Sequence, residues 1–514
     1  MSGWGGSVLH RLEHFAASTP NAPAYRIDDE VLDYPELRRR ARAAASGLRS
    51  IGLRPGDRVV IWLPNSLEWV IMGLAIHYAE AIVVPLNTRY TADEMTYIVQ
   101  RSGARAMVST DSFLGRDYLS EARAALPGLE FFIAASGGSE LTVAGLEAAG
   151  DPENPAIDEW LERISPDDLS DIMFTSGTTG YPKGAMITHG ATVGVVASAT
   201  PRLRIVQSDT QLVVAPFFHM FGYKYGWSYM IVVGGCTMAE PVFEVERVAT
   251  LIDRYRVEVF SGPPPLFYSL LALPDREARF DLSCIRFSLT GATIVQPSLI
   301  KDMQEVLGID HIAQGFGLTE TTACGTFTNP DDDIETIATT LGTAVDDVEV
   351  RVADEHGNEV PRGETGEFQV RGFCVMAGYY GDPDATAEAI TPDGWLRSGD
   401  LGTMDDRGYL RIIGRQKEVV IVGGFNVYPA EVERVLCEHP AISAAAVIGE
   451  ADPRMGEVPV AYVEGTADPQ EAIAWCAARL AKFKVPRRVV VVDELPRNAM
   501  GKVRKVDLAA SPLS

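Results

Sequence analysis

The sequence TSGTTGYPKG, residues 175–184, places four hydroxyl side chains around two glycines and closes with Lys183 and Gly184. Glycines let backbone N–H groups approach a ligand, hydroxyls donate hydrogen bonds, and a lysine supplies positive charge. The spacing is not that of a Walker loop. The preceding residues 171–174, DIMF, predict a strand that runs into the loop, and binding loops follow strand ends in α/β proteins. The segment indicates a polyphosphate site, with a plain surface turn as the alternative.

Strands and helices alternate around this loop. RVVIWL (58–63) and AIVVPL (81–86) predict short buried strands, and residues 37–53 predict an amphipathic helix. The same alternation returns at residues 257–262 and 285–292. This rhythm predicts parallel sheets with helices on their faces, which is an α/β fold.

The pattern changes twice toward the C-terminus. After Thr343, short strands separated by turns predict an antiparallel or barrel-like part. After Arg415 a new unit begins, with a helix, a strand and a second helix. We therefore expect doubly wound sheets and a small barrel-like part in a large N-terminal domain, residues 1–415, and a small α+β C-terminal domain, residues 416–514. The polar segment 136–171 predicts a surface excursion.

Composition excludes several classes of protein. A chain of 514 residues is too long for one core. The net charge of −25 argues against a nucleic-acid partner. The first fifteen residues contain no apolar signal-peptide core, and the apolar stretch 69–86 is interrupted by His77 and Glu80, so no membrane span is expected. Six scattered cysteines form no metal or disulfide pattern, and we expect reduced thiols in a cytoplasmic protein.

Three further segments have the chemistry to complete a nucleotide site. In QGFGLTE (314–320), an exposed Phe316 can stack on a purine and Glu320 can hold Mg²⁺ on the phosphates. In GWLRSGDLG (394–402), Asp400 lies between glycines, where its carboxylate can accept ribose hydroxyls. Lys502 lies in a glycine-containing loop near the C-terminus. Taken singly, these segments are more typical of a glycine turn, a common turn and a solvated lysine, respectively.

Taken in order, the segments resemble the adenylate-forming superfamily of acyl-CoA synthetases, luciferases and peptide-synthetase adenylation domains. The resemblance covers essentially the whole chain and is greatest to bacterial fatty-acyl-CoA synthetases. The strings PLNTRYTADE, PFFHMFGYK and GGFNVYPAEVE are similar to those of actinobacterial CoA ligases, one of which acts on the bicyclic propanoate left by sterol degradation. Two positions depart from the family: Phe316 replaces the usual Tyr, and Glu418 replaces the usual Asp.

The resemblance implies a role for each matching residue. The catalytic set is Lys502, which bridges the carboxylate and the α-phosphate, Glu320, and His219, which lines the acyl pocket near the reacting carboxylate. Thr175 and Glu320 are the implied metal contacts, and Gly423 and Gly424 border the pantetheine tunnel. The full set of implied nucleotide and CoA contacts is Thr175, Ser176, Gly177, Thr178, Thr179, Gly180, Lys183, Gly291, Ala292, Gln314, Gly315, Phe316, Gly317, Thr319, Asp400, Arg415, Gly423 and Gly424.

The implied reaction uses ATP, Mg²⁺ and coenzyme A. A medium- or long-chain fatty acid or a bicyclic alkanoate is adenylated with release of pyrophosphate, and the CoA thioester then forms with release of AMP. Between these steps the C-terminal domain is expected to rotate about Lys417. Lys224 is expected to meet a ring ketone if the acid is a bicyclic keto acid. The alternatives are an amide ligase with an amine acceptor and a non-catalytic adenylate binder. The oligomeric state stays open, a homodimer included.

Overall fold

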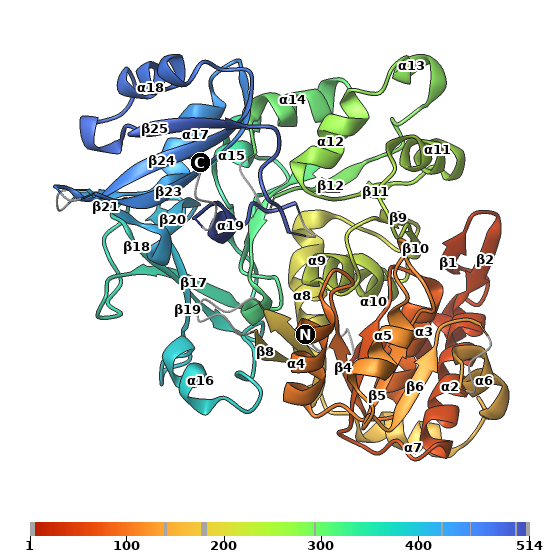
Figure 1. The fold of residues 1–514 in the computed structure, drawn as a ribbon. Coiled ribbons are helices and arrows are strands. Elements are labelled where there is room, and N and C mark those ends of the chain that lie inside the picture. The colour runs from red at the N-terminus through yellow and green to blue at the C-terminus, as the bar shows by residue number, and fades with distance from the viewer. Residues whose placement is uncertain are drawn as a thin grey trace.

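The computed structural model describes residues 6–137, 141–175, 182–291, 295–422, 425–452, 454–498 and 501–509. Figure 1 shows a large part built from the red to green elements and a smaller part, in blue, at one end of it. The described strands form five sheets, two of them largely parallel. The predicted α/β class, with a large N-terminal and a small C-terminal domain, is confirmed.

The first parallel sheet carries the strand that leads into the TSGTTGYPKG loop. Its apolar strands are joined by crossover helices, of which α4 (Ala92–Ser102) has clear end signals: Thr91 and Glu94 form a capping box, and Gly103 ends the helix in the left-handed conformation. Only the last strand pair, β7 with β8, is antiparallel among the described pairs of this sheet. In spatial order the strands are β6 (Phe131–Ala134), β5 (Ala106–Ser109), β3 (Arg58–Trp62), β4 (Ile82–Pro85), β7 (Leu169–Thr175) and β8 (Lys183–Thr188).

The second parallel sheet combines strands from residues 210–313 with β1 and β2 from near the N-terminus. Its outer face is covered by amphipathic helices α11 (Val245–Tyr255), α12 (Pro264–Leu271) and α14 (Pro297–Glu305), whose apolar residues form a separate core cluster with the strands. In spatial order the strands are β13 (His311–Ala313), β12 (Phe287–Leu289), β11 (Val259–Phe260), β9 (Thr210–Val213), β10 (Cys236–Ala239), β1 (Pro23–Ile27) and β2 (Glu30–Asp33).

Helix α3 (Leu67–Tyr78) lies between the two sheets. It packs on β3 and β4, and its Trp69 contacts the rings of Tyr223 and Trp227, which lie in a segment packed on β9. Every residue of α3 except Glu68 is buried, because both faces of the helix are covered. This explains the long apolar stretch in the sequence. Among the described helices, none has the length and apolarity needed to cross a membrane.

The antiparallel part after Thr343 is confirmed. A short hairpin sheet precedes it and carries Phe316. The strands of this hairpin sheet are β14 (Gly315–Phe316), β15 (Thr326–Phe327) and β16 (Thr343–Ala344). A four-stranded antiparallel sheet follows, with strands β17 (Val348–Ala353), β18 (Gly366–Gly372), β19 (Leu396–Met404) and β20 (Leu410–Arg415). The four-stranded sheet lies beside the C-terminal elements, with β20 packed against α17 (Pro429–Cys437) (Figure 1).

The C-terminal elements form a sheet with a core of its own, centred on Val432, Val447 and Ala461. A 3₁₀ turn, η3 (Gln416–Glu418), connects it to β20. Its strands are β21 (Val420–Val422), β22 (Phe425–Val427), β23 (Ile442–Asp452), β24 (Gly456–Gly465) and β25 (Arg488–Val492), and its helices are α17 (Pro429–Cys437), α18 (Pro469–Ala477) and α19 (Lys505–Ala509).

The expected surface excursion, residues 136–171, contains regular structure that the sequence did not predict. Two short helices, α6 (Val143–Ala149) and α7 (Ala156–Arg163), lie in it, and Ile157 and Trp160 anchor α7 in the core. The other helices of the large part are α1 (Val8–Ser18), α2 (Tyr34–Ser50), α5 (Tyr118–Ala125), α8 (His189–Leu203), α9 (Met220–Gly222), α10 (Ser228–Val233), α13 (Arg276–Arg279), α15 (Ile334–Thr339) and α16 (Pro383–Ala389).

Candidate active site

The phosphate loop is framed by the β7–β8 hairpin. Thr175 ends β7 and pairs across the hairpin with Lys183, the first residue of β8. The Thr175 hydroxyl donates to Glu320 Oε1 at 3.4 Å, so the sequence-predicted metal contacts meet although 145 residues separate them. The expected contacts Ser176, Gly177, Thr178, Thr179 and Gly180 lie outside the described residues.

Tyr379 is a site residue that the sequence reasoning missed. Its hydroxyl donates to Glu320 Oε1 at 2.9 Å, and the Lys183 Nζ lies 5.3 Å from the centre of its ring. The loop that carries it is pinned to β8, because Gly184 O accepts from Tyr380 N at 2.8 Å. Tyr379 therefore links the carboxylate of Glu320 to the lysine of the phosphate loop. The signal in the sequence was a tyrosine pair flanked by glycines, residues 378–381.

The expected purine wall is assembled from strand ends of the second sheet and the following hairpin. Gly291 follows β12, and an added Cβ on it would lie 3.8 Å from Gln314 Cγ, so these two residues are neighbours. Gln314 Nε2 donates to Thr340 O at 2.9 Å, while its Oε1 has no hydrogen-bond partner among the described residues. A buried, unpaired amide oxygen can accept from an exocyclic amine. Ala292 lies outside the described residues.

Two glycines bring the hairpin and the Glu320 turn together. A Cβ on Gly315 would lie 2.3 Å from Thr326 O, and one on Gly317 would lie 2.2 Å from the Ala323 carbonyl carbon. Neither position admits a side chain, so the hairpin passes directly over its neighbours. Thr319 and Glu320 then begin a 3₁₀ turn, η2 (Thr319–Thr321).

The expectation of an exposed Phe316 is wrong. Its ring is buried, with 7% of the residue exposed, and packs edge-to-face on Phe368 at 5.5 Å between centroids. Phe368 comes from β18, which the sequence could not place beside residue 316. Phe316 thus supports the site as part of the core.

Asp400 and Arg415 face each other across β19 and β20. Asp400 is 2% exposed, and Arg415 Nε lies 2.9 Å from its Oδ1. The contact is an ion pair without an aligned hydrogen bond, and Asp400 Oδ1 has no hydrogen-bond partner within the described part of the chain. Burial raises the pKa of Asp400, against the opposing charges of Arg415 and Lys502. A buried carboxylate with a free lone pair is suited to accept hydrogen bonds from hydroxyl groups.

Lys502 lies in the loop between β25 and α19 of the C-terminal domain. Its loop is held by Asn498, whose Oδ1 accepts from Lys502 N at 3.0 Å and whose N donates to Lys502 O at 2.8 Å. Partial desolvation and the Arg415 charge lower the pKa of Lys502, while the carboxylates of Asp400 and Glu418 oppose this. The lysine therefore lies within electrostatic range of the Asp400–Arg415 pair.

His219 presents a neutral imidazole. It caps α9, and its Nδ1 accepts from Phe221 N at 3.2 Å. Burial lowers its pKa to about 4. At neutral pH the ring is therefore uncharged, and because Nδ1 accepts, the proton is assigned to Nε2, which is then a donor.

Lys224 is not a pocket residue, and the expectation that it meets a ring ketone is wrong. It is 1% exposed, and its Nζ donates to Asp171 Oδ2 at 2.6 Å. Tyr223 OH donates to the other oxygen of Asp171 at 2.5 Å. The ion pair joins the π-helical turn η1 (Tyr223–Trp227) to β7. Phe217, Tyr223 and Trp227 are fully buried as well, so most of this aromatic segment is core.

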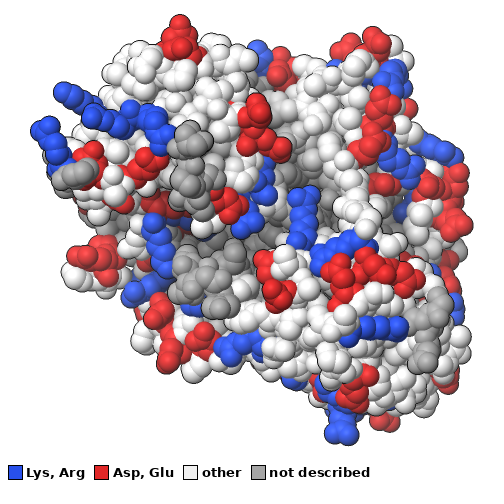
Figure 2. Space-filling view, in the orientation of Figure 1, with Lys and Arg blue, Asp and Glu red and all other residues white. Residues whose placement is uncertain are grey.

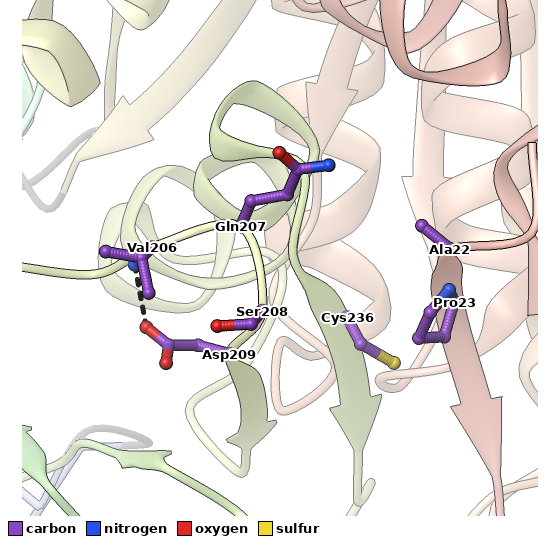
Figure 3. Close-up of a pocket in the computed structure, with 7 residues that line it drawn as sticks. All are labelled: Ala22, Pro23, Val206, Gln207, Ser208, Asp209 and Cys236. Carbon is purple, nitrogen blue, oxygen red and sulfur yellow. Dashed lines mark hydrogen bonds between the residues drawn. The ribbon is translucent and has the colours of Figure 1, made fainter. Parts of the chain in front are cut away.

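A hollow of about 560 Å³ lies away from these residues. Figure 3 shows it between the start of β1 and the starts of β9 and β10, with Asp209 turned back to accept from Val206 N at 2.7 Å. Ligands of open parallel sheets bind beyond the carboxyl ends of the strands, and this hollow is at the opposite ends. Its lining residues are Ala22, Pro23, Val206, Gln207, Ser208, Asp209 and Cys236.

Because the protein is strongly acidic, a site that binds anions needs positive charge nearby. The chain carries a net charge of −25, and Figure 2 shows acidic and basic side chains interspersed over one face of the molecule. A protein with this charge repels anions at long range, so an anion site needs its own cations. Lys183, Arg415 and Lys502 supply them around the loop and the buried carboxylate.

The fold and this set of residues are those of an adenylating enzyme, with a large N-terminal and a small C-terminal domain. Comparison with known families supports the assignment: residues 12–380 match the AMP-binding enzyme family, and residues 431–502 match the AMP-binding enzyme C-terminal domain. The chain belongs to the AMP-binding enzyme family.

Relatives extend over nearly the whole chain. It is 42% identical, over 98% of both chains, to the 3-[(3aS,4S,7aS)-7a-methyl-1,5-dioxo-octahydro-1H-inden-4-yl]propanoyl:CoA ligase of Mycobacterium tuberculosis. It is 41% identical to the ligase of the same name from Rhodococcus jostii, over 93% of both chains. The crystal structure of ATP-bound MatB from Rhodopseudomonas palustris superposes with a TM-score of 0.88, at 30% identity and 98% coverage of both chains. The predicted class, an AMP-forming acyl-CoA ligase, is confirmed.

Proposed function

We propose that this acyl-CoA ligase activates a bicyclic alkanoic acid of the indane-propanoate type and that Lys502, Asp400, Arg415, Glu320 and His219 carry the reaction. The observation that supports the site is the buried Asp400–Arg415 ion pair, which has Lys502 of the C-terminal domain within Coulombic range. An adenylating lysine has to lie at that place, since the α-phosphate adjoins the ribose that Asp400 holds.

Adenylation brings two anions together. An oxygen of the substrate carboxylate attacks the α-phosphorus of ATP in line, the bond to the β-phosphate oxygen breaks, and pyrophosphate leaves. The reaction needs positive charge at the α-phosphate more than it needs a base. Lys502 supplies this charge, Arg415 and Asp400 hold the ribose, and the loop beginning at Thr175 holds the phosphates that leave.

Thr175 and Glu320 fit a divalent cation that is held mainly by phosphates. The described donors are one hydroxyl and one carboxylate, both hard oxygen ligands, and the described residues contain no cluster of three metal-binding side chains. Mg²⁺ prefers to keep water and phosphate ligands and to take one or two from protein. Bound there, the ion would neutralise charge on the phosphates, while Tyr379 keeps the Glu320 carboxylate in place.

The acyl group is expected to pass directly from the adenylate to CoA. Burial raises the pKa of Cys324 and of Cys236 to about 12, so neither thiol is a nucleophile at neutral pH. The thiol of CoA, with a pKa of about 8.5, has a usable thiolate fraction at neutral pH. We place the domain boundary after Arg415 and the hinge at Lys417, so that rotation withdraws Lys502 before the thiol enters. Gly423 and Gly424, the expected tunnel residues, lie outside the described residues.

The acid is proposed from the two relatives of the same name, which come from different genera. His219 supports a carboxylate at the expected position, because a neutral imidazole can donate from Nε2 to the reacting acid without competing with Lys502 for charge. ATP and CoA are metabolites of the cytoplasm, and we propose that the enzyme works there.

A panel of acids decides the proposal. The purified enzyme is mixed with ATP, Mg²⁺ and CoA plus either an indane-dione propanoate, decanoate, palmitate or ferulate, and thioester and AMP are quantified. We expect the highest kcat/KM for the indane-dione propanoate. A preference of ten-fold or more for a linear fatty acid would overturn the substrate, and amide formation with an amine in place of CoA would favour the amide-ligase alternative.

A further inference from the structure

Lys505 makes a three-group ion cluster beside the proposed catalytic lysine. Its Nζ lies 2.7 Å from Glu418 Oε2 and 2.7 Å from Glu433 Oε1. The three residues come from α19, η3 and α17, so one ammonium ties together three elements of the C-terminal domain. Glu433 is fixed independently, because its Oε1 also accepts from Val447 N at 2.8 Å.

The cluster adjoins the reacting groups on both of its chain segments. Lys502 precedes Lys505 by three residues, and Glu418 follows Arg415 by three residues. Although burial opposes it, Lys505 is the strongest of the cations that lower the pKa of Glu418, and the other two are Arg415 and Lys502. Glu418 is therefore a charged carboxylate that contacts Lys505 and lies within Coulombic range of Arg415 and Lys502, the two cations of the proposed reaction.

We propose that Lys505 is a positioning residue for adenylation, which occupies the Glu418 carboxylate and so leaves Lys502 free for the α-phosphate. The inference rests on the proposed function, in which Lys502 is the adenylating lysine. Without Lys505, Glu418 has Lys502 and Arg415 as its remaining charged neighbours. A carboxylate paired with Lys502 would hold the ammonium away from ATP and cancel the charge that the transition state needs.

The Glu433 contact makes this arrangement specific. Both carboxylates raise the pKa of Lys505 against the effect of burial, so its ammonium stays charged. Because Glu433 anchors Lys505 from α17, the lysine cannot follow Glu418 toward the active site. Glu418, where the family usually has Asp, meets Lys505 at 2.7 Å.

The half-reactions separate positioning from a general structural role. In Lys505→Met, we expect single-turnover pyrophosphate release to fall about 100-fold, as a misplaced catalytic group does. Thioester formation from supplied acyl-adenylate and CoA should stay within two-fold of wild type, which also shows that the variant is folded. In the double variant Lys505→Met/Glu418→Gln, the competing carboxylate is gone, and adenylation should recover at least ten-fold relative to Lys505→Met.

Lys484→Met is the matched control. Lys484 lies in the same domain as Lys505 and forms a 2.7 Å ion pair with Glu431, which lies on α17 as Glu433 does. The side chains of Lys484 and Lys505 are similarly exposed. Its loss should leave the ratio of the two half-reactions unchanged. An equal loss of both half-reactions in Lys505→Met, or no recovery in the double variant, overturns the inference.

Lys502→Ala distinguishes the two levels of the proposal. If Lys502→Ala still releases pyrophosphate at the wild-type rate, the proposed function of Lys502 fails. If Lys502→Ala is inactive in adenylation while Lys505→Met keeps the wild-type rate, the role of Lys505 alone is wrong.

Discussion

Tyr379 and Glu320 are joined by a 2.9 Å hydrogen bond from the phenol to Oε1, the same oxygen that accepts from Thr175. Burial and the nearby Glu320 charge raise the pKa of Tyr379, so the phenol stays protonated and remains a donor throughout the neutral range. The carboxylate that would meet Mg²⁺ is therefore oriented by two hydroxyl groups.

Removal of the phenol should weaken the metal–phosphate contact. We expect Tyr379→Phe to lower kcat/KM for ATP about 10-fold, the value of one hydrogen bond to a charged group. The Mg²⁺ concentration at half-maximal pyrophosphate release should rise as well. Glu320→Gln serves as the reference for complete loss. Wild-type Mg²⁺ dependence in Tyr379→Phe would remove the tyrosine from the site.

Lys502→Ala should separate the two half-reactions. Without the ammonium at the α-phosphate, pyrophosphate release should fall by at least about 100-fold. Thioester formation from supplied acyl-adenylate needs no charge there and should proceed at nearly the wild-type rate. Quenched-flow measurement of each step tests this, and parallel losses would contradict the division of roles.

The partly buried His219 should make stability depend on pH. Its pKa is about 4 in the folded protein and about 6.5 when unfolded, so the unfolded chain binds the extra proton between these values. The contribution of His219 to the free energy of unfolding is fully present above pH 6.5 and is lost as the pH falls toward 4. Relative to pH 7, this group should cost about 2 kcal/mol at pH 5. Urea unfolding of wild type and His219→Asn at both pH values should show a smaller pH effect in the variant.

Lys224 and Asp171 should matter for stability and not for substrate choice. Lys224→Met leaves a carboxylate unpaired in the core and should reduce the free energy of unfolding by about 3–5 kcal/mol. The double variant Lys224→Met/Asp171→Asn should regain much of this, since no buried charge remains. Discrimination between keto and non-keto acids should be unchanged in the double variant. A selective loss for keto acids would restore Lys224 to the pocket.

The hinge should affect the second step more than the first. Lys417 lies in the middle of η3, between β20 and β21. Because proline fixes φ, Lys417→Pro should restrict rotation about this turn. We expect slower thioester formation with little change in pyrophosphate release, as measured by single-turnover kinetics. Equal effects on both steps would place the hinge elsewhere.

Local sequence patterns predicted most helices and strands. The features that they did not predict depend on contacts between residues far apart in the sequence. The helix expected at residues 37–53 is α2, which begins earlier because Asp33 caps it through the backbone N of Glu36. The pairs Tyr379–Glu320 and Lys224–Asp171 bring together residues 59 and 53 positions apart. A periodicity or motif contains no information about such partners, so the tyrosine was missed and the lysine misplaced.

Some site residues could likewise be predicted from the sequence, and the surroundings of others depend on the fold. Thr175, Asp400 and Lys502 could be chosen because their motifs follow one another in the order of the adenylate-forming superfamily, although each motif alone is weak. The burial of Phe316 depends on Phe368, a strand away in the antiparallel sheet, and only the folded chain shows it. Expectations for the loop 176–180 and for Gly423 and Gly424 stay predictions.

Helix α3 has a consequence for how the chain unfolds. One continuous core contains residues of both parallel sheets, such as Val59 and Val259, together with α3 between them, whereas the C-terminal sheet has a core of its own. Loss of either parallel sheet would expose the shared helix, so the two sheets should melt as a single cooperative unit. The C-terminal domain can open without that cost. We therefore expect the two parallel sheets to stay intact during the proposed rotation of the part that carries Lys502.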